Sequence, residues 1–449
     1  IRLTLFMRRL AYDEQAAWKD RHHRKPLILS GVRQCGKTHL LREFGEKNYE
    51  NTAYVNFEDS PESVHIFDGN LDPHRIVDDL GLFMNMSIRP GKTLIILDEV
   101  QFCGRAITSL KYFCENAPEY HVACAGSLLG VRLSLSGSFP VGKVDFIDMH
   151  PLGFREFLMA NGEDMLCSRL IESPKEKPAA PLTAKLERYL RYYYVVGGMP
   201  EAVAEWVSSK DITAVENVQK NILRSYAEDF GRHAAEDLNE LTLIWRSIPV
   251  QLSKENKRFI FSHVKTGKRA KDLAQALEWL ISAGLIHKVR KISRPAIPLS
   301  AYSDEMIFKI YFVDIGLLRV LAGIPPAFIF DAGGEYSHFK ETMAENYVLN
   351  ELKLLGKDPY YWRSKGDAEV DFVDVFGLRI VPVEVKAETN SKSKSLAQYI
   401  REYGPKTAIT ASMNDSVSVN GAVGIPLWLV WMVKDILGDD ASGFGIPTS

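Results

Sequence analysis

The sequence predicts an α/β protein whose N-terminal part is built on a parallel sheet, followed by a helical part and a second α/β part. In residues 27–150, short apolar runs alternate with helical patterns, which is typical of a parallel sheet covered by helices on both faces. Helical patterns dominate residues 186–249, and from Ile307 the pattern becomes mixed again, with a turn around Phe376 and Gly377. We therefore expect two α/β parts separated by helices.

Each apolar run of the first part predicts one strand of its sheet. The runs are Leu27–Leu29, Ala53–Phe57, Leu94–Leu97, His121–Ala125 and Val144–Ile147. At roughly 150 residues per domain, a chain of this length suggests about three domains. Shifts in pattern divide it further, and we expect the parts to span residues 1–185, 186–249, 250–305 and 306–449.

Bulk composition excludes several classes of protein. The chain is 46% hydrophobic with a net charge of −2, so it can bury several cores and has no overall bias towards polyanions or membranes. It has 5 cysteines and no CxxC pair, which argues against a disulfide framework or a zinc site. No apolar run reaches the ~18 residues of a membrane span, and no signal peptide is evident. We expect a cytoplasmic protein whose start could be Met7.

A glycine-rich loop follows the first predicted strand. Residues Gly31–Thr38 read GVRQCGKT, which fits GxxxxGK[ST] between a strand and a helix. In such a loop, backbone N–H groups and the helix N-terminus surround phosphates. We expect Lys37 to contact the β- and γ-phosphates of ATP and Thr38 to bind Mg²⁺. The expected ATP-binding residues are Gly31, Val32, Arg33, Gln34, Cys35, Gly36, Lys37, Thr38 and His39.

Two carboxylates end the strand Leu94–Leu97. Asp98 and Glu99 stand at the edge where ligands bind in open α/β sheets. We expect Asp98 to hold Mg²⁺ and Glu99 to activate the attacking water, although Asp98 could instead cap the next helix. Ser127, after the strand His121–Ala125, could sense the γ-phosphate or merely cap the following segment. Glu99 favours hydrolysis over phosphoryl transfer to a small acceptor, as in a small-molecule kinase.

These motifs and later ones resemble a single family. The strings GVRQCGKTHLLREF, LIILDEVQ, SLKYFCENAPEYHVACAGSLLGV and FPVGKVDFIDMHPLGFREFL, then GGMPEAV and YFVDIGLLR…ENYVLNEL…EVDFV…PVEVK, are similar to the prokaryotic AAA-type ATPases that carry a C-terminal domain of unknown function. The likeness runs from Met7 to about Val433. It implies a P-loop AAA-type ATPase domain at 1–185, a helical lid at 186–249, a winged-helix-like segment at 250–305 and a PD-(D/E)xK nuclease-like domain at 306–449.

One segment is strongly basic. Residues 251–294 contain three acids and eleven lysines and arginines, namely Lys254, Lys257, Arg258, Lys265, Lys268, Arg269, Lys271, Lys288, Arg290, Lys291 and Arg294. A helical pattern, a glycine turn and a β-like run follow one another here and look like a winged helix. Clustered basic residues on such a unit are typical of DNA binding. The alternatives are a solvated basic face, or a face that docks on the acidic remainder of the chain.

Acids gather around the turn at Phe376 and Gly377. If these two residues form the hairpin loop, Asp371 lies opposite Pro382 and Glu369 opposite Glu384, which places Asp371, Glu384 and Lys386 on one face of the sheet. This set resembles the PD-(D/E)xK nuclease core, in which two acids bind Mg²⁺ or Mn²⁺ and a lysine helps to activate water. Glu345 matches the additional helical acid, and Gln398 follows in a later helical pattern. The alternatives are a solvated charged hairpin, or a nuclease-like fold that only binds.

Two readings of the function remain open. In the first, the chain is an ATPase coupled to DNA binding, with or without nuclease activity. In the second, ATP turnover switches a regulatory protein whose C-terminal domain only binds a partner. The chain could also form a homo-oligomer, and an arginine that completes the ATP site could be any of Arg105, Arg132, Arg224 and Arg232.

Overall fold

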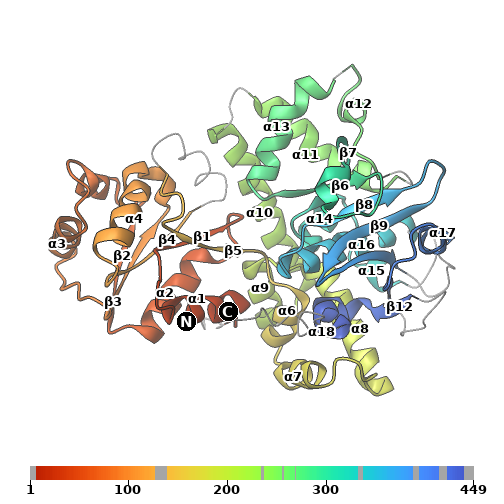
Figure 1. The fold of residues 1–449 in the computed structure, drawn as a ribbon, viewed down its shortest axis with the longest axis horizontal. Helices are drawn as coiled ribbons and strands as arrows, with labels where there is room; N and C mark the ends of the chain where they lie inside the picture. The colour runs from red at the N-terminus through yellow and green to blue at the C-terminus, as the bar shows by residue number, and fades with distance from the viewer. Residues whose placement is uncertain are drawn as a thin grey trace, which may run out of the picture. The chain divides into compact units, whose positions relative to one another are not determined.

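The computed structural model describes residues 7–126, 139–233, 237–254, 257–267, 269–331, 337–387, 394–413 and 422–438. The chain forms two compact units (Figure 1), one of Ile1–Pro151 with Trp279–Leu285 and one of Leu152–Glu278 with Ile286–Ser449. None of the described helices is both long and apolar enough to cross a membrane. The predicted α/β class is confirmed, and the predicted division into four parts stays a prediction.

The first unit is built on a five-stranded parallel sheet. Its strands are β1 (Leu27–Gly31), β2 (Asn51–Asn56), β3 (Thr93–Asp98), β4 (His121–Ala125) and β5 (Asp145–Met149), in the spatial order β2-β3-β4-β1-β5. All the pairings are parallel, and each strand begins within two residues of its predicted start. Because parallel strands end at the same edge, the residues after β1 and after β3 lie at one edge of the sheet.

Helices cover both faces of this sheet. Figure 1 shows α1 (Leu10–Lys19) and α2 (Lys37–Asn48) on one side, and α4 (Gly104–Asn116) on the other with α3 (Pro73–Phe83) beside it. Two short 3-10 turns, η1 (Pro61–Phe67) and η2 (Val100–Phe102), complete the unit. Alternate strand residues such as Ile28, Ile95 and Val122 pack on Leu80 and Leu110. Two buried faces explain why these strands are continuously apolar.

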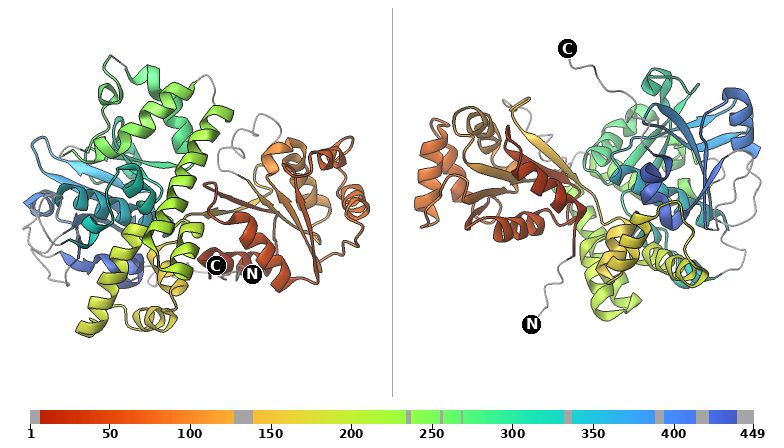
Figure 2. Two further views of the ribbon diagram at one scale, coloured as in Figure 1. Left: turned by 180° about the vertical axis from the view of Figure 1, so that it is seen from behind. Right: turned by 60° about the horizontal axis from the view of Figure 1, so that its bottom comes forward.

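The second unit begins with a long helical stretch. Its helices are α6 (Phe154–Ala160), α7 (Asp164–Glu172), α8 (Ala180–Val196), α9 (Pro200–Ser209), α10 (Ile212–His233), α11 (Leu238–Leu252) and α12 (Phe261–Val264), followed by α13 (Ala270–Ser282), which ends in the segment grouped with the first unit. In Figure 2 the long helices of this stretch, coloured yellow to green, lie side by side. Five further helices follow: α14 (Ile315–Leu321), α15 (Ala327–Phe330), α16 (Ser337–Leu354), α17 (Lys394–Tyr403) and α18 (Val433–Leu437). This part also contains the 3-10 turns η5 (Leu299–Tyr302) and η7 (Leu427–Met432).

The glycine pair of the GGMP string fits against a buried carboxylate. Gly197 has φ 73°, and a Cβ there would stand 2.3 Å from an oxygen of Asp314. Gly198 donates its N–H to that carboxylate at 2.6 Å, and Leu317 donates its N–H to it at the start of α14. A side chain at Gly197 would therefore clash with Asp314, and one at Gly198 would clash with the carbonyl oxygen of Leu152, 2.0 Å from its Cβ.

A mixed seven-stranded sheet completes the second unit. Its strands are β6 (Ile286–Ile292), β7 (Ser303–Phe312), β8 (Tyr360–Arg363), β9 (Glu369–Phe376), β10 (Arg379–Lys386), β11 (Ile409–Ser412) and β12 (Val423–Pro426), in the order β12-β11-β10-β9-β8-β6-β7. Helix α16 contacts β7 and β10, and α17 contacts β9. The strand expected after α13 is β6, and it pairs with β7 and β8 inside this sheet.

The predicted register of the β9–β10 hairpin is wrong by two residues. Phe376 pairs with Arg379, so the loop is Gly377 and Leu378 rather than Phe376 and Gly377. Gly377 has φ 58°, the left-handed conformation that a tight hairpin loop needs at its first position. A shift of two residues leaves every side chain on its predicted face.

Candidate functional site

The loop Gly31–Thr38 carries the backbone geometry of a phosphate-binding loop. Gln34 has φ 64° and Gly36 has φ 92°, and left-handed residues in such a loop turn successive N–H groups to one side. A Cβ on Gly31 would stand 2.2 Å from the carbonyl oxygen of Met149, so this position takes only glycine. Helix α2 starts at Lys37, directly after Gly36. The loop and the helix N-terminus together form a surface that suits an anion.

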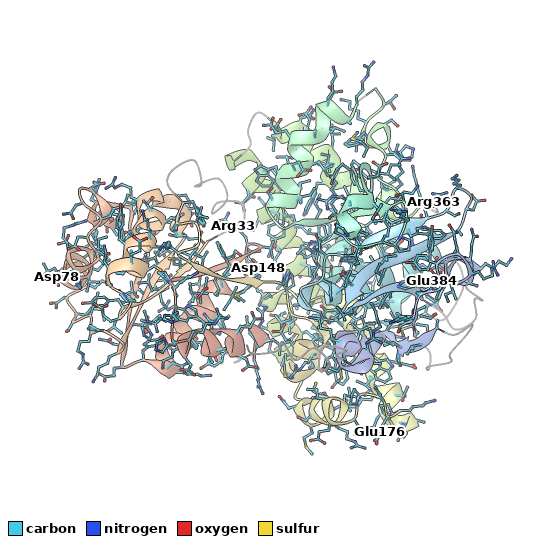
Figure 3. The ribbon with its side chains drawn as sticks, viewed as in Figure 1. Arg33, Asp78, Asp148, Glu176, Arg363 and Glu384 are labelled. Atoms are coloured by element: carbon cyan, nitrogen blue, oxygen red, sulfur yellow. The ribbon has the colours of Figure 1, made fainter. Side chains whose placement is uncertain are left out.

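Lys37 lies inside this loop. Its side chain is buried, and its Nζ donates to the carbonyls of Gly31 at 3.0 Å and Val32 at 2.9 Å. Within the part of the chain that the structure describes, no ion pair joins Lys37 to a carboxylate. Thr38 and Arg33, the latter labelled in Figure 3, are both half-buried. The ammonium charge therefore sits where a phosphate would be bound.

An arginine from outside the motif is hydrogen-bonded to the loop. Arg9, just before α1, is buried and donates to the carbonyl of Cys35 at 2.7 Å and to the carbonyl of His150 at 2.6 Å. Sequence reasoning missed this residue, because it precedes the loop by more than twenty positions and belongs to no motif. Its contacts fix the phosphate loop to the end of the segment that follows β5.

The two acids after β3 differ in their surroundings. Asp98 is buried; one of its oxygens accepts the N–H of Glu99, and the other accepts the hydroxyl of Tyr54 at 2.9 Å. Glu99 is half-buried with φ 49° and ψ 43°, and its carboxylate accepts the side-chain amide of Gln101. A non-glycine residue in this conformation costs about 1–3 kcal/mol, and such strain collects at functional sites.

Tyr54 was not predicted as a site residue. Burial, and then the Asp98 carboxylate, raise the pKa of Tyr54 to about 12, so the hydroxyl keeps its proton and donates. The sequence feature that could have identified Tyr54 is a tyrosine on β2, next to a strand that ends in an acid. Its bond fixes the orientation of the Asp98 carboxylate.

The structure does not test the role predicted for Ser127, and it does not identify the arginine expected to complete the site. Ser127, Arg132 and the side chain of Arg232 lie outside the described residues. Arg105 binds the carbonyls of Phe67 and Gly69, and exposed Arg224 pairs with Glu228 one turn along α10. The described contacts therefore do not single out an arginine that completes the site.

The predicted acids of the second unit do come together. Glu345 from α16, Asp371 from β9 and Glu384 from β10 are all buried, and Figure 3 marks Glu384 on its strand. Burial first, then the nearby Glu345 and Glu384, raise the pKa of Asp371 well above its usual range. Lys386 lies 2.9 Å from a Glu384 oxygen. Gln398 lies half-buried on α17.

The fold adds basic groups to this cluster that the sequence did not predict. Lys257 pairs with one oxygen of Glu345, while the hydroxyl of Tyr311 donates to the other at 2.8 Å. Although burial alone would raise the pKa of Glu345, Lys257 and Lys309 lower it to about 2. A lysine within the apolar run of β7 was the signal that could have identified Lys309, because lysine is rarely buried without a partner.

Many residues of the basic segment are already paired. Lys257 binds Glu345, and both Lys288 and Arg290 lie within salt-bridge distance of Glu305. By contrast Lys265, Arg269 and Lys271 are exposed around the turn from α12 to α13, and Lys268 lies outside the described residues. The basic surface is therefore smaller than the sequence suggests.

Three family models match separate parts of the chain. One described as an AAA domain matches residues 23–158, a domain of unknown function (DUF8612) matches residues 187–327, and a domain of unknown function (DUF4143) matches residues 340–429. Residues 23–158 are similar to an AAA-type ATPase domain. This agrees with the five-stranded parallel sheet of the first unit, and the segment is named the AAA-like domain below. The nuclease-like assignment of the C-terminal part gains no support from these matches.

Several solved structures align with this chain at low identity and with TM-scores below 0.5. The Walker-type ATPase PABY2304 of Pyrococcus abyssi is 15% identical, with 70% of this chain and 95% of that chain covered and a TM-score of 0.44. The ORC1 protein of Aeropyrum pernix in complex with DNA is 14% identical, with 72% and 92% covered and a TM-score of 0.28. AMPPCP-bound DnaA from Aquifex aeolicus is 13% identical, with 61% and 87% covered and a TM-score of 0.29. A search of curated proteins gave no significant match.

Proposed function

We propose that the AAA-like domain binds ATP with Mg²⁺ and hydrolyses it. The observation that carries the proposal is that the loop Gly31–Thr38 follows β1 while Asp98 and Glu99 stand at the end of β3, with β4 between them in one parallel sheet. Ligands of open α/β sheets bind at this edge, beyond the carboxyl ends of the strands.

The residues at this edge fit a magnesium nucleotide. The left-handed backbone at Gln34 and Gly36 and the start of α2 direct N–H groups towards an anion. The ammonium of Lys37 is bonded to carbonyls, which it can exchange for phosphate oxygens without breaking an ion pair. Thr38 and Asp98 would hold Mg²⁺ through their oxygens.

Each side chain then has a distinct role. Mg²⁺ would neutralise charge on the phosphates. Glu99 would orient the attacking water and take its proton, and its strained backbone fixes the direction from which the carboxylate reaches that water. Ser127 is proposed to sense the γ-phosphate.

Two substitutions test this proposal. Lys37→Ala should weaken ATP binding at least about tenfold, because it removes a charge-assisted contact of about 1.5–3 kcal/mol. Glu99→Gln should keep ATP affinity and slow turnover by roughly 10²–10⁴-fold. Binding is measured by calorimetry and turnover by phosphate release. If Lys37→Ala leaves ATP affinity unchanged, the loop Gly31–Thr38 is not the phosphate-binding loop. If Glu99→Gln turns over ATP at the normal rate, another residue activates the attacking water.

We further propose that the segment from α12 to α13 contacts the phosphates of DNA. Its support is the exposure of Lys265, Arg269 and Lys271 around one turn, since an exposed group of lysines and arginines is the electrostatic footprint of a nucleic-acid binder. The paired Lys288 and Arg290 would contribute less, because Glu305 already compensates them.

For the C-terminal domain, the arrangement of charges favours binding over cleavage. The acids that a nuclease would use for metal ions are bonded to lysines and to Tyr311. We therefore favour the reading in which ATP turnover switches a protein whose C-terminal domain recognises a partner. Incubation of the full chain with DNA and Mg²⁺ or Mn²⁺ tests this choice. Cleavage that Glu384→Ala abolishes, with ATP turnover intact, would restore the nuclease reading.

A further inference from the structure

A lysine stands inside the acidic cluster of the second unit. The side chain of Lys309 is 1% exposed, and its Nζ lies 2.5 Å from Glu369 Oε1, 3.9 Å from Glu345 Oε2 and 4.0 Å from Asp371 Oδ1. Glu345 comes from α16, Glu369 and Asp371 come from β9, and the lysine comes from a third element, β7. The ammonium therefore lies where the acids converge, which is where a shared cation would lie.

The ammonium of Lys309 is charged and is surrounded by its partners. Burial alone would lower the pKa of Lys309, but Tyr311 and the carboxylates of Glu369, Glu345 and Asp371 raise it well above its usual value. The ring of Tyr361 lies 5.0 Å from Nζ and covers it from another direction. Buried charges persist in proteins when they are paired in this way.

Several other oxygens of the cluster also have partners. Glu345 accepts from Lys257 and from Tyr311, and Asp371 Oδ2 accepts the backbone N–H of Val385 at 2.8 Å. Glu384 Oε1 is bound by Lys386. A divalent ion needs several oxygens at about 2.0–2.6 Å, and here those oxygens face lysines. Across the described residues, no group of three or more His, Cys, Asp or Glu side chains is placed to hold a metal ion.

We propose that Lys309 takes the place of a divalent cation, so that the C-terminal domain keeps its acidic cluster without binding Mg²⁺ or Mn²⁺ there. A divalent ion beside the ammonium would be repelled, and the low dielectric of a buried site strengthens that repulsion. The cluster then acts as an internal ion-pair network that joins α16 to β7, β9 and β10. This inference concerns the second unit alone and does not depend on ATP binding.

Removal of the ammonium should create a metal site. We expect Lys309→Met, which keeps the length of the side chain, to bind one Mn²⁺ per chain at least about tenfold more tightly than the background of the wild-type chain. The added Asp371→Asn substitution, which changes an acid beside the ammonium, should abolish the gained site. Binding is followed in the nucleotide-free full chain by the loss of the electron paramagnetic resonance signal of free Mn²⁺, so the readout needs no activity.

Two controls separate the cause from general effects. Lys309→Arg keeps the charge and should gain no Mn²⁺. Lys353→Met removes a lysine from a surface pair with Asp358 and should gain none either. Absence of a gained site in folded Lys309→Met would overturn the proposal. If that variant does not fold, the wild-type chain still tests the proposal. Mn²⁺ binding by the wild-type chain that Asp371→Asn removes would also overturn it.

Discussion

A single hydroxyl sets the orientation of the carboxylate expected to hold Mg²⁺. Tyr54 donates to one oxygen of Asp98 at 2.9 Å, and the backbone of Glu99 donates to the other. The ring of Tyr54 is itself held by the guanidinium of Arg42, 4.8 Å from its centroid. The position of the carboxylate therefore depends on a residue that would not touch the nucleotide.

Tyr54→Phe should loosen that carboxylate without removing it. We expect the Mg²⁺ concentration for half-maximal ATP turnover to rise by about tenfold or more, the usual effect of losing a group that orients a metal ligand. Nucleotide binding without Mg²⁺ should change little, because Lys37 does not contact Tyr54 in the described structure. A magnesium dependence equal to that of the wild-type chain would show that Asp98 needs no such support. Tyr112→Phe on α4 is a matched control.

Single residues outside motifs were the hardest to predict. Arg9 and Lys309 act through contacts with elements distant in the chain, and nothing in their neighbours marks those partners. The loop Gly31–Thr38 could be predicted because the function proposed for it requires a local order of glycines, lysine and threonine. The position of Asp98 could also be predicted, since it follows an apolar strand directly.

Elements were predicted more reliably than their registers. Continuous apolar runs predicted the strands of the parallel sheet, because both faces of that sheet are buried. The β9–β10 hairpin was placed two residues out, because the position of Gly377 within its loop depends on backbone angles that the pattern does not show. A shift of two residues preserves the alternation of side chains, so Asp371 and Glu384 share one face in both the predicted and the observed register.

The start of helix α6 rests on two buried acids. Glu156 accepts the N–H of Gly153 at 3.0 Å, and Glu351 accepts the N–H of Phe154 at 2.7 Å. Burial first, and then Glu156, raise the pKa of Glu351 to about 8 from 4.5. The unfolded chain therefore releases this proton at lower pH than the folded chain, so folding loses stability as the pH rises from about 4.5 to about 8.

Glu351→Gln should remove that dependence. The amide oxygen can still accept from Phe154, and it has no proton to release. We expect the variant to gain in melting temperature over the wild-type chain as the pH rises from 5 to 8.5, with at most ~1.4 kcal/mol per pH unit inside this window. Glu228→Gln, at an exposed position on α10, is the control. A difference between variant and wild type that stays constant with pH would contradict the account.

The turn between α12 and α13 should give a measurable salt dependence. If Lys265, Lys268, Arg269 and Lys271 contact phosphates, the log–log slope of duplex-DNA affinity against salt should include about −0.9 per contact. Replacement of all four residues by alanine should make the slope less negative by the total of their contributions. Replacement of the paired Lys288 and Arg290 should change it less. No binding at ~50 mM salt would favour a basic face that docks on the chain itself.

At the scale of the whole molecule, the chain first passes from one unit to the other at Pro151 and Leu152, and the residues on either side of this connector are hydrogen-bonded within their own units. On the first unit, Arg9 holds the carbonyl of His150. On the second unit, Leu152 donates its N–H to Gly198 at 2.7 Å and accepts the hydroxyl of Tyr193 at 2.6 Å. Only Pro151 lies between these anchored residues.

Arg9→Gln should uncouple the phosphate loop from this connector, because a glutamine amide is too short to replace a guanidinium that reaches both carbonyls. In the wild-type chain, a non-hydrolysable ATP analogue should change hydrogen exchange at His150 and Leu152. In the variant that change should shrink severalfold, while exchange in β3 stays as it was. Arg8→Gln, which alters an exposed pair with Asp13, is the matched control. An undiminished response in Arg9→Gln would show that the loop and the connector are independent.

The double contact of Arg9 has a mechanical consequence. Coupling between two sites is reciprocal in free energy. If nucleotide binding by the loop stiffens the connector, a force applied to the connector must in turn change the affinity of the loop for the nucleotide. A partner that holds the second unit under load would then be sensed as a change in ATP affinity at Gly31–Thr38. If Arg9 couples the loop to the connector in this way, Arg9→Gln should make ATP affinity insensitive to such a load.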